Sequence, residues 1–175
     1  MAIDGEQDDS LFRAGRRAHV LQLLRRYTDN HVELTRHLAR ALGVHITDAV
    51  AVAEILWAET AETSLSPARL AERIGLTSGA TTTLLNRLED SGLIVRSREN
   101  PDRRIVTLHL TPGARTRTTA FFIPTGKQLD RVLDGYDDAA LEGVEHLLTD
   151  VVAAITAHNA RLRDTPPTSD TGPAP

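Results

Sequence analysis

Two helical periods of apolar residues, separated by a short polar turn, stand at the centre of this chain. The first runs from residue 66 to residue 74, and the second begins at Thr77-Ser78. Ser66 followed by Pro67 is typical of a helix start, and Gly75 is typical of a helix end. We therefore expect two helices that meet at a tight corner. Their inward-facing set is predicted to be Leu70, Ala71, Ile74, Thr81, Leu84, Leu85 and Leu88.

The remaining positions of the second helix form a small, polar and almost uncharged face. They are Ser78, Gly79, Thr82, Thr83, Asn86 and Arg87. Short hydroxyl and amide side chains can approach base edges closely, and the N–H groups at the start of a helix can bind a phosphate. This face is therefore a candidate DNA-binding surface, although an ordinary solvated helix face has the same pattern.

Two stretches with strand-like alternation follow the helices. They span residues 93–98 and 105–111, and residues 99–104 form the tip between them. An arginine-rich hairpin of this length can reach into a minor groove. Helix, turn, helix and hairpin together predict a winged helix-turn-helix, whose cationic finger carries Arg96, Arg98, Arg103 and Arg104.

The order and spacing of these motifs resemble the MarR family of bacterial transcriptional regulators. The resemblance rests on the runs LAERIGL (70–76), SGAT (78–81), NRLEDSGLI (86–94), DRR (102–104) and LT (110–111). In that family the tip carries an Asp-x-Arg pair, which falls here on Asp102 and Arg104. The resemblance implies that Asp102 braces the tip and that Arg104 enters the minor groove. The expected DNA-binding wing then comprises Arg96, Arg98, Asp102, Arg103 and Arg104.

Long helical patterns flank the winged helix on both sides. The first spans residues 11–42, and the last follows Gly135 and Asp137. Both carry apolar positions at alternating steps of four and three residues, which is the spacing of paired helices. We therefore expect a homodimer whose seam includes Val20, Leu24, Leu141, Val144, Leu148, Val151 and Ile155. The same steps continue through Tyr27, His31, Leu34, Leu38 and Ala41 and through His158 and Leu162.

Two further helices complete a mainly α fold. One is predicted over residues 47–57, opened by Thr47-Asp48, with Ala51, Val52, Ile55 and Leu56 inward. The other begins at Pro112-Gly113, and Pro124 is expected to kink or end it before a second part. The predicted organisation is a disordered lead-in (1–9), a helical dimerisation region (10–43 and 112–164), a winged-helix DNA-binding domain (44–111) and a disordered tail (165–175).

The few aromatic residues mark a candidate effector pocket. In the resembled family a small, often phenolic ligand lodges between the dimerisation helices and the winged helix. The resemblance therefore implies a small organic effector near Tyr27, His31, Trp57, Phe121 and Phe122. Ordinary core packing is the alternative for each of these side chains.

The formal net charge of −4 conceals an uneven distribution. Residues 64–117 contain nine arginines and five acidic residues, a net charge of +4, so the remainder of the chain carries −8. A basic winged helix on an acidic body would orient the protein on a polyanion. Double-stranded DNA is therefore the expected partner, with an affinity that falls as salt rises.

Several functional classes find no support in the composition. The chain has no cysteine, which excludes disulfides and redox sensing through sulfur. Its seven histidines form no paired ligand set, and no nucleophile has a recognisable base, so we expect no metal, no cofactor and no catalytic residue. No apolar run is long enough to cross a membrane, and residues 1–20 do not resemble a signal peptide, so we expect a cytoplasmic protein without a membrane partner.

The combined interpretation is a ligand-responsive transcriptional regulator, expected to be a repressor, that binds a palindromic operator as a homodimer. The alternative is a winged helix that serves as a protein-interaction module without sequence-specific DNA binding. Salt-dependent retention on duplex DNA would separate these two hypotheses. A small-molecule enzyme is a third hypothesis, and it lacks candidate residues.

Overall fold

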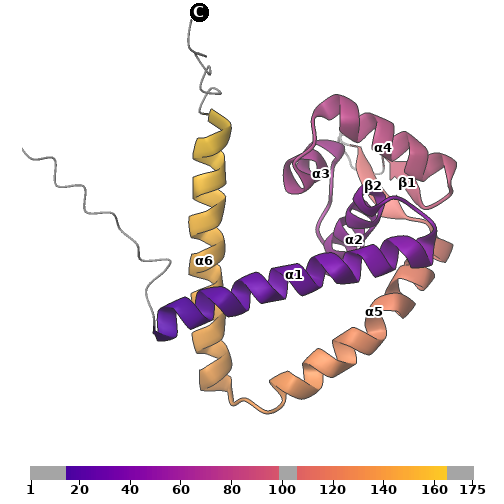
Figure 1. Cartoon of the computed structure of the whole chain (residues 1–175). Coiled ribbons are helices and arrows are strands. Elements are labelled where there is room, and N and C mark those ends of the chain that lie inside the picture. Colours follow the sequence, from indigo (N-terminus) through magenta and orange to yellow (C-terminus); the bar gives the residue numbers. More distant parts are fainter. Residues whose placement is uncertain (1–14, 99–105, 165–175) are drawn as a thin grey trace, which may run out of the picture. The chain divides into compact units, whose positions relative to one another are not determined.

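A computed structural model describes residues 15–98 and 106–164 of the chain. The elements confirm the predicted mainly helical fold with a small antiparallel hairpin (Figure 1). In chain order they are α1 (Arg16–Leu42), α2 (Ile46–Thr60), α3 (Pro67–Ile74), α4 (Ser78–Asp90), β1 (Ile94–Ser97), β2 (Thr107–Leu110), α5 (Pro112–Leu133) and α6 (Asp138–Asp164).

The chain divides into two compact units, with the boundary between Ile123 and Pro124. The first unit holds α1 to α4, the hairpin and the beginning of α5, and the second holds the rest of α5 and α6. The predicted functional division at residues 43/44 and 111/112 does not coincide with these units. Flanking helices contribute Leu38, Leu42 and Ala114 to the same core as the winged helix.

The core of the first unit collects the apolar positions predicted for the winged helix. Leu84, Leu85 and Leu88 of α4 and Leu70 of α3 are at most 2% exposed. Thr81 is buried with them and donates its hydroxyl to a backbone oxygen one turn earlier, at 2.9 Å. Ala71 and Ile74 are half-buried at the edge of this core. On α2 the predicted inward set is buried as well: Ala51, Val52, Ile55 and Leu56.

Local capping explains the tight corner between α3 and α4. The Ser66 hydroxyl accepts a hydrogen bond from the third residue beyond it at 3.3 Å, and Pro67 occupies the first helical position. Gly75 then adopts the left-handed conformation, with φ at 68°, which costs glycine little. Thr77 caps α4 by accepting from the Ala80 N–H at 3.3 Å.

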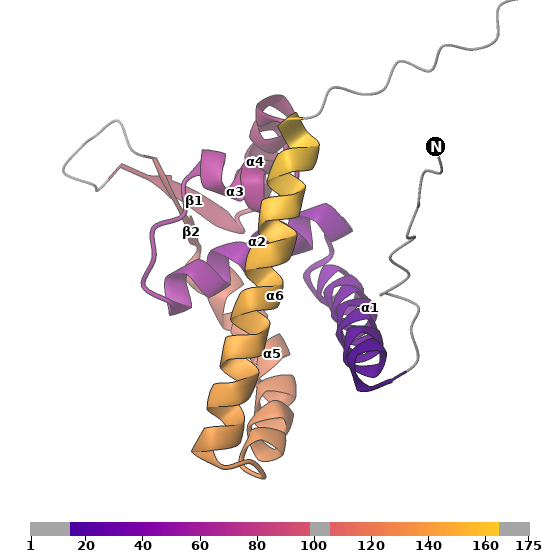
Figure 2. The same cartoon turned by 90° about the vertical axis from the view of Figure 1, so that its left-hand side faces the viewer.

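The hairpin follows a second left-handed glycine. Gly92 has φ at 66°, and the next N–H donates back to the Leu88 oxygen at 2.9 Å. The strands then pair with Ile94 opposite Leu110. Both strands are shorter than the predicted stretches 93–98 and 105–111. Figure 2 shows the hairpin extending from the side of α3 and α4.

Three predicted helix boundaries need correction. Helix α1 begins at Arg16 instead of residue 11, since Gly15 before it has a non-helical backbone with φ at 134°. Helix α2 begins earlier than expected, at Ile46. Helix α5 continues through Pro124 to Leu133, although the proline removes one backbone donor.

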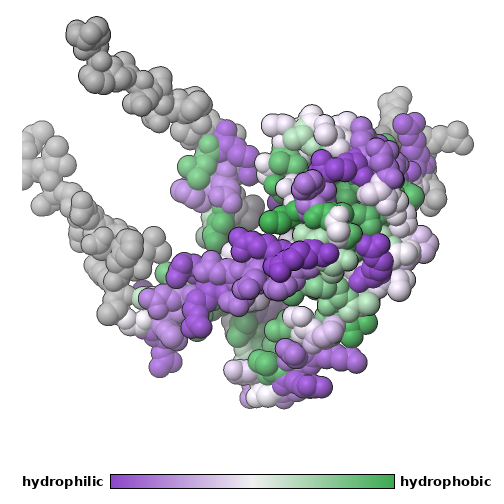
Figure 3. Space-filling view, turned by 45° about the vertical axis from the view of Figure 1, so that its right-hand side comes forward, coloured by the Kyte–Doolittle hydropathy of each residue, from purple (hydrophilic) through white to green (hydrophobic). Residues whose placement is uncertain are grey.

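The polar surface of α1 indicates which part of this helix belongs to the core. Hydrophilic side chains cover most of its outward face in the space-filling view (Figure 3). Its buried residues, Leu38, Ala39 and Leu42, all lie near its C-terminal end. The N-terminal part of the predicted seam stays more open, because Tyr27 is 65% exposed and Val20 and Leu24 are half-buried.

Candidate nucleic-acid interface

The predicted outer face of α4 is exposed along the whole helix. Ser78, Gly79, Thr82, Thr83 and Asn86 are all solvent-accessible. The two threonine hydroxyls donate to the backbone oxygens four residues earlier, at 2.9 and 3.2 Å. Their oxygens can still accept a hydrogen bond, and both side chains are small. The face therefore combines small size with hydrogen-bonding capacity, as an approach to a groove requires.

Arg87 is the exception within the predicted face. Its Nε donates to Asp48 Oδ2 at 2.9 Å, and its NH2 group forms a second, short contact with Asp48 Oδ1. Asp48 is 1% exposed, so this pair secures a buried carboxylate between α2 and α4. The hydrogen bond to Asp48 raises the pKa of Arg87 above its ordinary value. Arg87 is therefore engaged in the fold, and Asp48, expected only at the opening of α2, is its buried partner.

Arg96 of β1 also has partners on α4. Its NH1 lies 2.8 Å from Glu89 Oε2, and its NH2 donates to Asn86 Oδ1 at 2.8 Å. The arginine thus joins the first wing strand to the outer face of α4. Arg98, two residues later, is exposed at the end of the described strand. The predicted tip residues Asp102, Arg103 and Arg104 lie outside the described residues.

Glu59 anchors the second wing strand, and the sequence reasoning missed it. Its side chain is 7% exposed, and Oε1 accepts from the Leu110 N–H at 3.1 Å and faces His109 Nδ1 at 3.2 Å. Arg115 NH2 lies 2.8 Å from Oε2 as an ion pair, although the angle is not that of a hydrogen bond. One carboxylate therefore ties α2 to both β2 and α5. The sequence signal was faint: Glu59 is one of three acids on α2, with Asp48 and Glu54, and its position near the end of the helix does not mark it as buried.

The predicted effector residues fall into two groups. Trp57 and Phe122 have ring centroids 5.1 Å apart, and Phe121 meets Phe122 edge-on at 5.2 Å. Trp57 remains 44% exposed, so this aromatic cluster is accessible to solvent. Tyr27 and His31 stack on each other at 6.1 Å within α1. No ring contact connects the two groups in the part of the chain that the structure describes.

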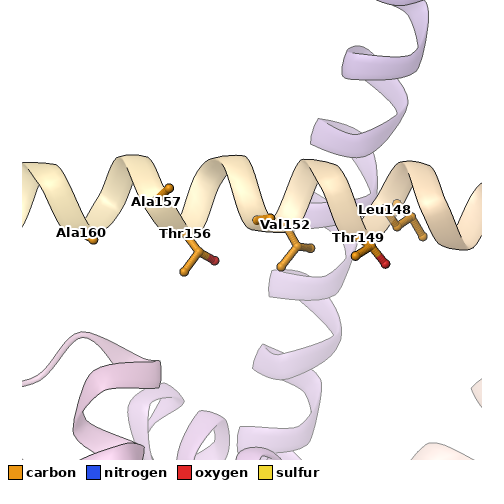
Figure 4. Close-up of a pocket in the computed structure, with 7 residues that line it drawn as sticks. Leu148, Thr149, Val152, Thr156, Ala157 and Ala160 are labelled. Carbon is orange, nitrogen blue, oxygen red and sulfur yellow. The ribbon is translucent and has the colours of Figure 1, made fainter.

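Helix α6 presents much of its apolar surface to solvent. Of its predicted seam, Val144, Leu148 and Ile155 are exposed by 41 to 57%, while Leu141 and Val151 are half-buried. An open apolar hollow also runs along this helix on the adjoining face and shares Leu148 with the seam (Figure 4). Its lining comes entirely from α6: Leu148, Thr149, Val152, Ala153, Thr156, Ala157 and Ala160. A surface this apolar is typical of a protein contact.

Residues 15–98 and 106–164 show neither a metal site nor a single helix that could span a membrane. These residues contain no group of three or more His, Cys, Asp or Glu side chains placed to hold a metal ion. None of the helices there has by itself both the length and the apolar composition of a membrane span. Only α1 and α2 taken together reach those measures, and they are bent by 98°.

The sequence of the winged helix matches a known family. Residues 53–106 match the model of the MarR family. A curated relative from Methylorubrum extorquens (strain PA1), the HTH-type transcriptional regulator TtmR, is 43% identical over 61 residues. That alignment covers 35% of this chain and 30% of the relative. The similarity in sequence is therefore concentrated in the winged helix.

Solved structures extend the similarity of the fold to most of the chain. Staphylococcus aureus MepR in its DNA-binding conformation aligns with a TM-score of 0.61 at 15% identity, covering 78% of this chain and 98% of MepR. Streptococcus pneumoniae FabT in complex with DNA gives 0.57 at 23% identity, covering 81% and 99%. MarR from Oenococcus oeni PSU-1 gives 0.57 at 17% identity, covering 77% and 98%. The match over residues 53–106 confirms the resemblance to the MarR family seen in the sequence motifs of the winged helix, and the solved structures show the same fold over most of the chain.

Proposed function

We propose that this protein is a transcriptional regulator, acting as a repressor, that binds a palindromic DNA operator as a homodimer and responds to a small organic ligand. The observation that carries the proposal is the exposed outer face of α4, which is small, polar and held beside a basic hairpin. Support also comes from FabT, a protein of similar fold that was solved with DNA. Such an operator lies in the bacterial cytoplasm, which is the compartment we propose.

The proposed homodimer rests on the exposed apolar surface of α6. This helix is 27 residues long, and none of the side chains described for it, at residues 138–163, is fully buried. A helix of that kind gains little stability without a packing partner. A second copy of the chain is the occupant we propose, because it would cover the seam and would add a second recognition helix. Two such helices about 34 Å apart would reach successive major grooves of a palindromic site.

Selection from a random pool of duplexes tests the function directly. The full chain should retain a subset of duplexes that share an inverted repeat, and retention should fall as salt is raised. Uniform retention of all duplexes, or none, would remove sequence-specific binding and leave the protein-interaction hypothesis. The selected duplex then serves as the operator in every further measurement.

Arg104→Ala should weaken operator affinity by about 1–3 kcal/mol and reduce the salt slope by about one. The expectation follows from the MarR-family Asp-x-Arg pair, in which the arginine enters the minor groove; Asp102→Ala should have a similar effect. Fluorescence anisotropy across a salt series measures both quantities. Arg131→Ala, which removes an exposed charge from α5, is the matched control. If Arg104→Ala and Asp102→Ala both keep wild-type affinity, the tip has no part in binding.

The aromatic cluster of Trp57, Phe121 and Phe122 is the proposed site of the effector. An apolar ligand that packs on these rings should change Trp57 emission and lower operator affinity by about 5–150-fold, a coupling of about 1–3 kcal/mol. A panel of aromatic acids and metabolites, titrated against both signals, checks this prediction. Free N-acetyltryptophanamide, titrated with the same compounds, controls for quenching that does not involve the site, because Trp57 is the only tryptophan of the chain. A compound that saturates the emission change without altering operator affinity would rule out this cluster as the switch.

A further inference from the structure

Asn86 lies on the exposed face of α4, one helical turn after Thr82. Its side-chain amide has a donor end and an acceptor end, and the two ends prefer different bases. In the major groove guanine presents two acceptors, N7 and O6, whereas adenine presents one acceptor and one donor. Which end of the amide faces outward therefore decides which base Asn86 prefers.

Arg96 determines that orientation. A guanidinium has donors only, so the amide atom that it contacts at 2.8 Å must be the oxygen, Oδ1. The same guanidinium is held at its other end by Glu89 Oε2, also at 2.8 Å. Glu89 and Asn86 are three residues apart on α4 and so share one side of the helix. The pair of contacts anchors Arg96 and prevents the amide from rotating freely.

The outward end of Asn86 is then its NH2 group, which keeps its donors available. The oxygen has a second lone pair, but a cation beside it repels any further donor, such as the exocyclic amine of adenine. Arg96 itself is 29% exposed and adds positive potential to the same place. Acceptors on the DNA are therefore favoured here over donors.

We propose that Arg96 acts as a positioning residue that makes Asn86 a donor-only reader with a preference for guanine at one base pair of each half-site. This proposal rests on the proposed function, since it requires that α4 enters the major groove. It goes further by naming the residue that reads, the residue that orients it and the base that they select.

The test uses the full chain and the duplex selected from the random pool, with each base pair then changed in turn. At one guanine per half-site, replacement by adenine should lower wild-type affinity by about tenfold or more. In Asn86→Ala the ratio of the affinity for the guanine duplex to that for the adenine duplex should fall close to one. Asn86→Asp should do the same, because aspartate still accepts from Arg96 but has no donor to offer. Arg96→Ala should also reduce the ratio, because the amide is then free to turn over.

Arg98→Ala is the matched control for Arg96→Ala. Both variants remove a wing-strand arginine, but Arg98 has no described contact with α4. It should lower affinity for all duplexes without changing the ratio of guanine to adenine. A measurement on the DNA avoids any effect of mutation on folding: 7-deazaguanine lacks the N7 acceptor, so it should weaken wild-type binding at that position and leave Asn86→Ala unaffected.

The outcomes separate the two proposals. If the wild type selects no duplex, the proposed function fails. If it selects an operator but no guanine depends on Asn86, or if the dependent base is adenine, the donor-only assignment is wrong while the proposed function stands. A uniform loss of affinity in Asn86→Ala, without any change in base preference, would place this side chain on a phosphate and overturn the inference.

Discussion

The double variant Val151→Asp, Ile155→Asp should be monomeric under conditions in which the wild type is a dimer. Both residues lie on the predicted seam of α6, where Ile155 is 57% exposed and Val151 half-buried. An unpaired carboxylate in an apolar interface costs several kcal/mol, and two-fold symmetry doubles the number of such groups. The dissociation constant of the dimer should therefore rise by at least about 1,000-fold. Light scattering over a range of protein concentrations measures it.

The same variant should lose operator binding, because a single recognition helix reaches only one half-site. His146→Asp is the control, since it adds an acid at an exposed polar position of the same helix. It should remain dimeric and should still bind the operator. Circular dichroism establishes whether the double variant is folded. A double variant that is folded and still dimeric would show that the seam has been assigned to the wrong face of α6.

Arg87→Ala should lower the free energy of unfolding by about 3 kcal/mol, because it leaves the Asp48 carboxylate charged, 1% exposed and unpaired. The raised pKa of Arg87 means that the pair contributes its full stability below the ordinary arginine pKa and loses it only as the pH rises beyond the raised value. The loss in the variant should therefore be similar throughout the neutral range. Urea unfolding at fixed protomer concentration measures it.

Arg73→Ala is the matched control for this prediction. Arg73 of α3 pairs at 3.0 Å with Glu54 of α2, the helix that also carries Asp48. Both side chains of this pair are about one-third exposed, at 38% and 32%. An exposed pair of this kind contributes about 1 kcal/mol or less. Adding Asp48→Asn to Arg87→Ala should recover part of the stability, since the buried charge is then gone. Equal losses in Arg87→Ala and Arg73→Ala would mean that the buried pair has no special role.

Sequence patterns predicted the helix-turn-helix well because its signals are local. The caps Ser66 and Thr77, the turn at Gly75 and the spacing of the leucines each act within one or two helical turns. Errors occurred where one residue has two readings. Gly15 was overlooked as a helix boundary, Pro124 does not end α5, and Asp48 was expected only to open α2 although it is the buried partner of Arg87. The tip, with Asp102 and Arg104, stays a prediction.

The sequence by itself determined the order of the elements, the inward faces of α2, α3 and α4, and the family motifs. Tertiary structure decided which polar side chains of the candidate interface are held by contacts within the fold and which are left exposed. Arg87 meets an aspartate 39 residues away, and Glu59 meets a backbone N–H 51 residues away. The orientation of the Asn86 amide depends on an arginine from the next strand. Periodicity reports only neighbours within a helix or strand, whereas these contacts form when separate elements pack together, so only the folded chain separates a side chain that is free to bind from one already held.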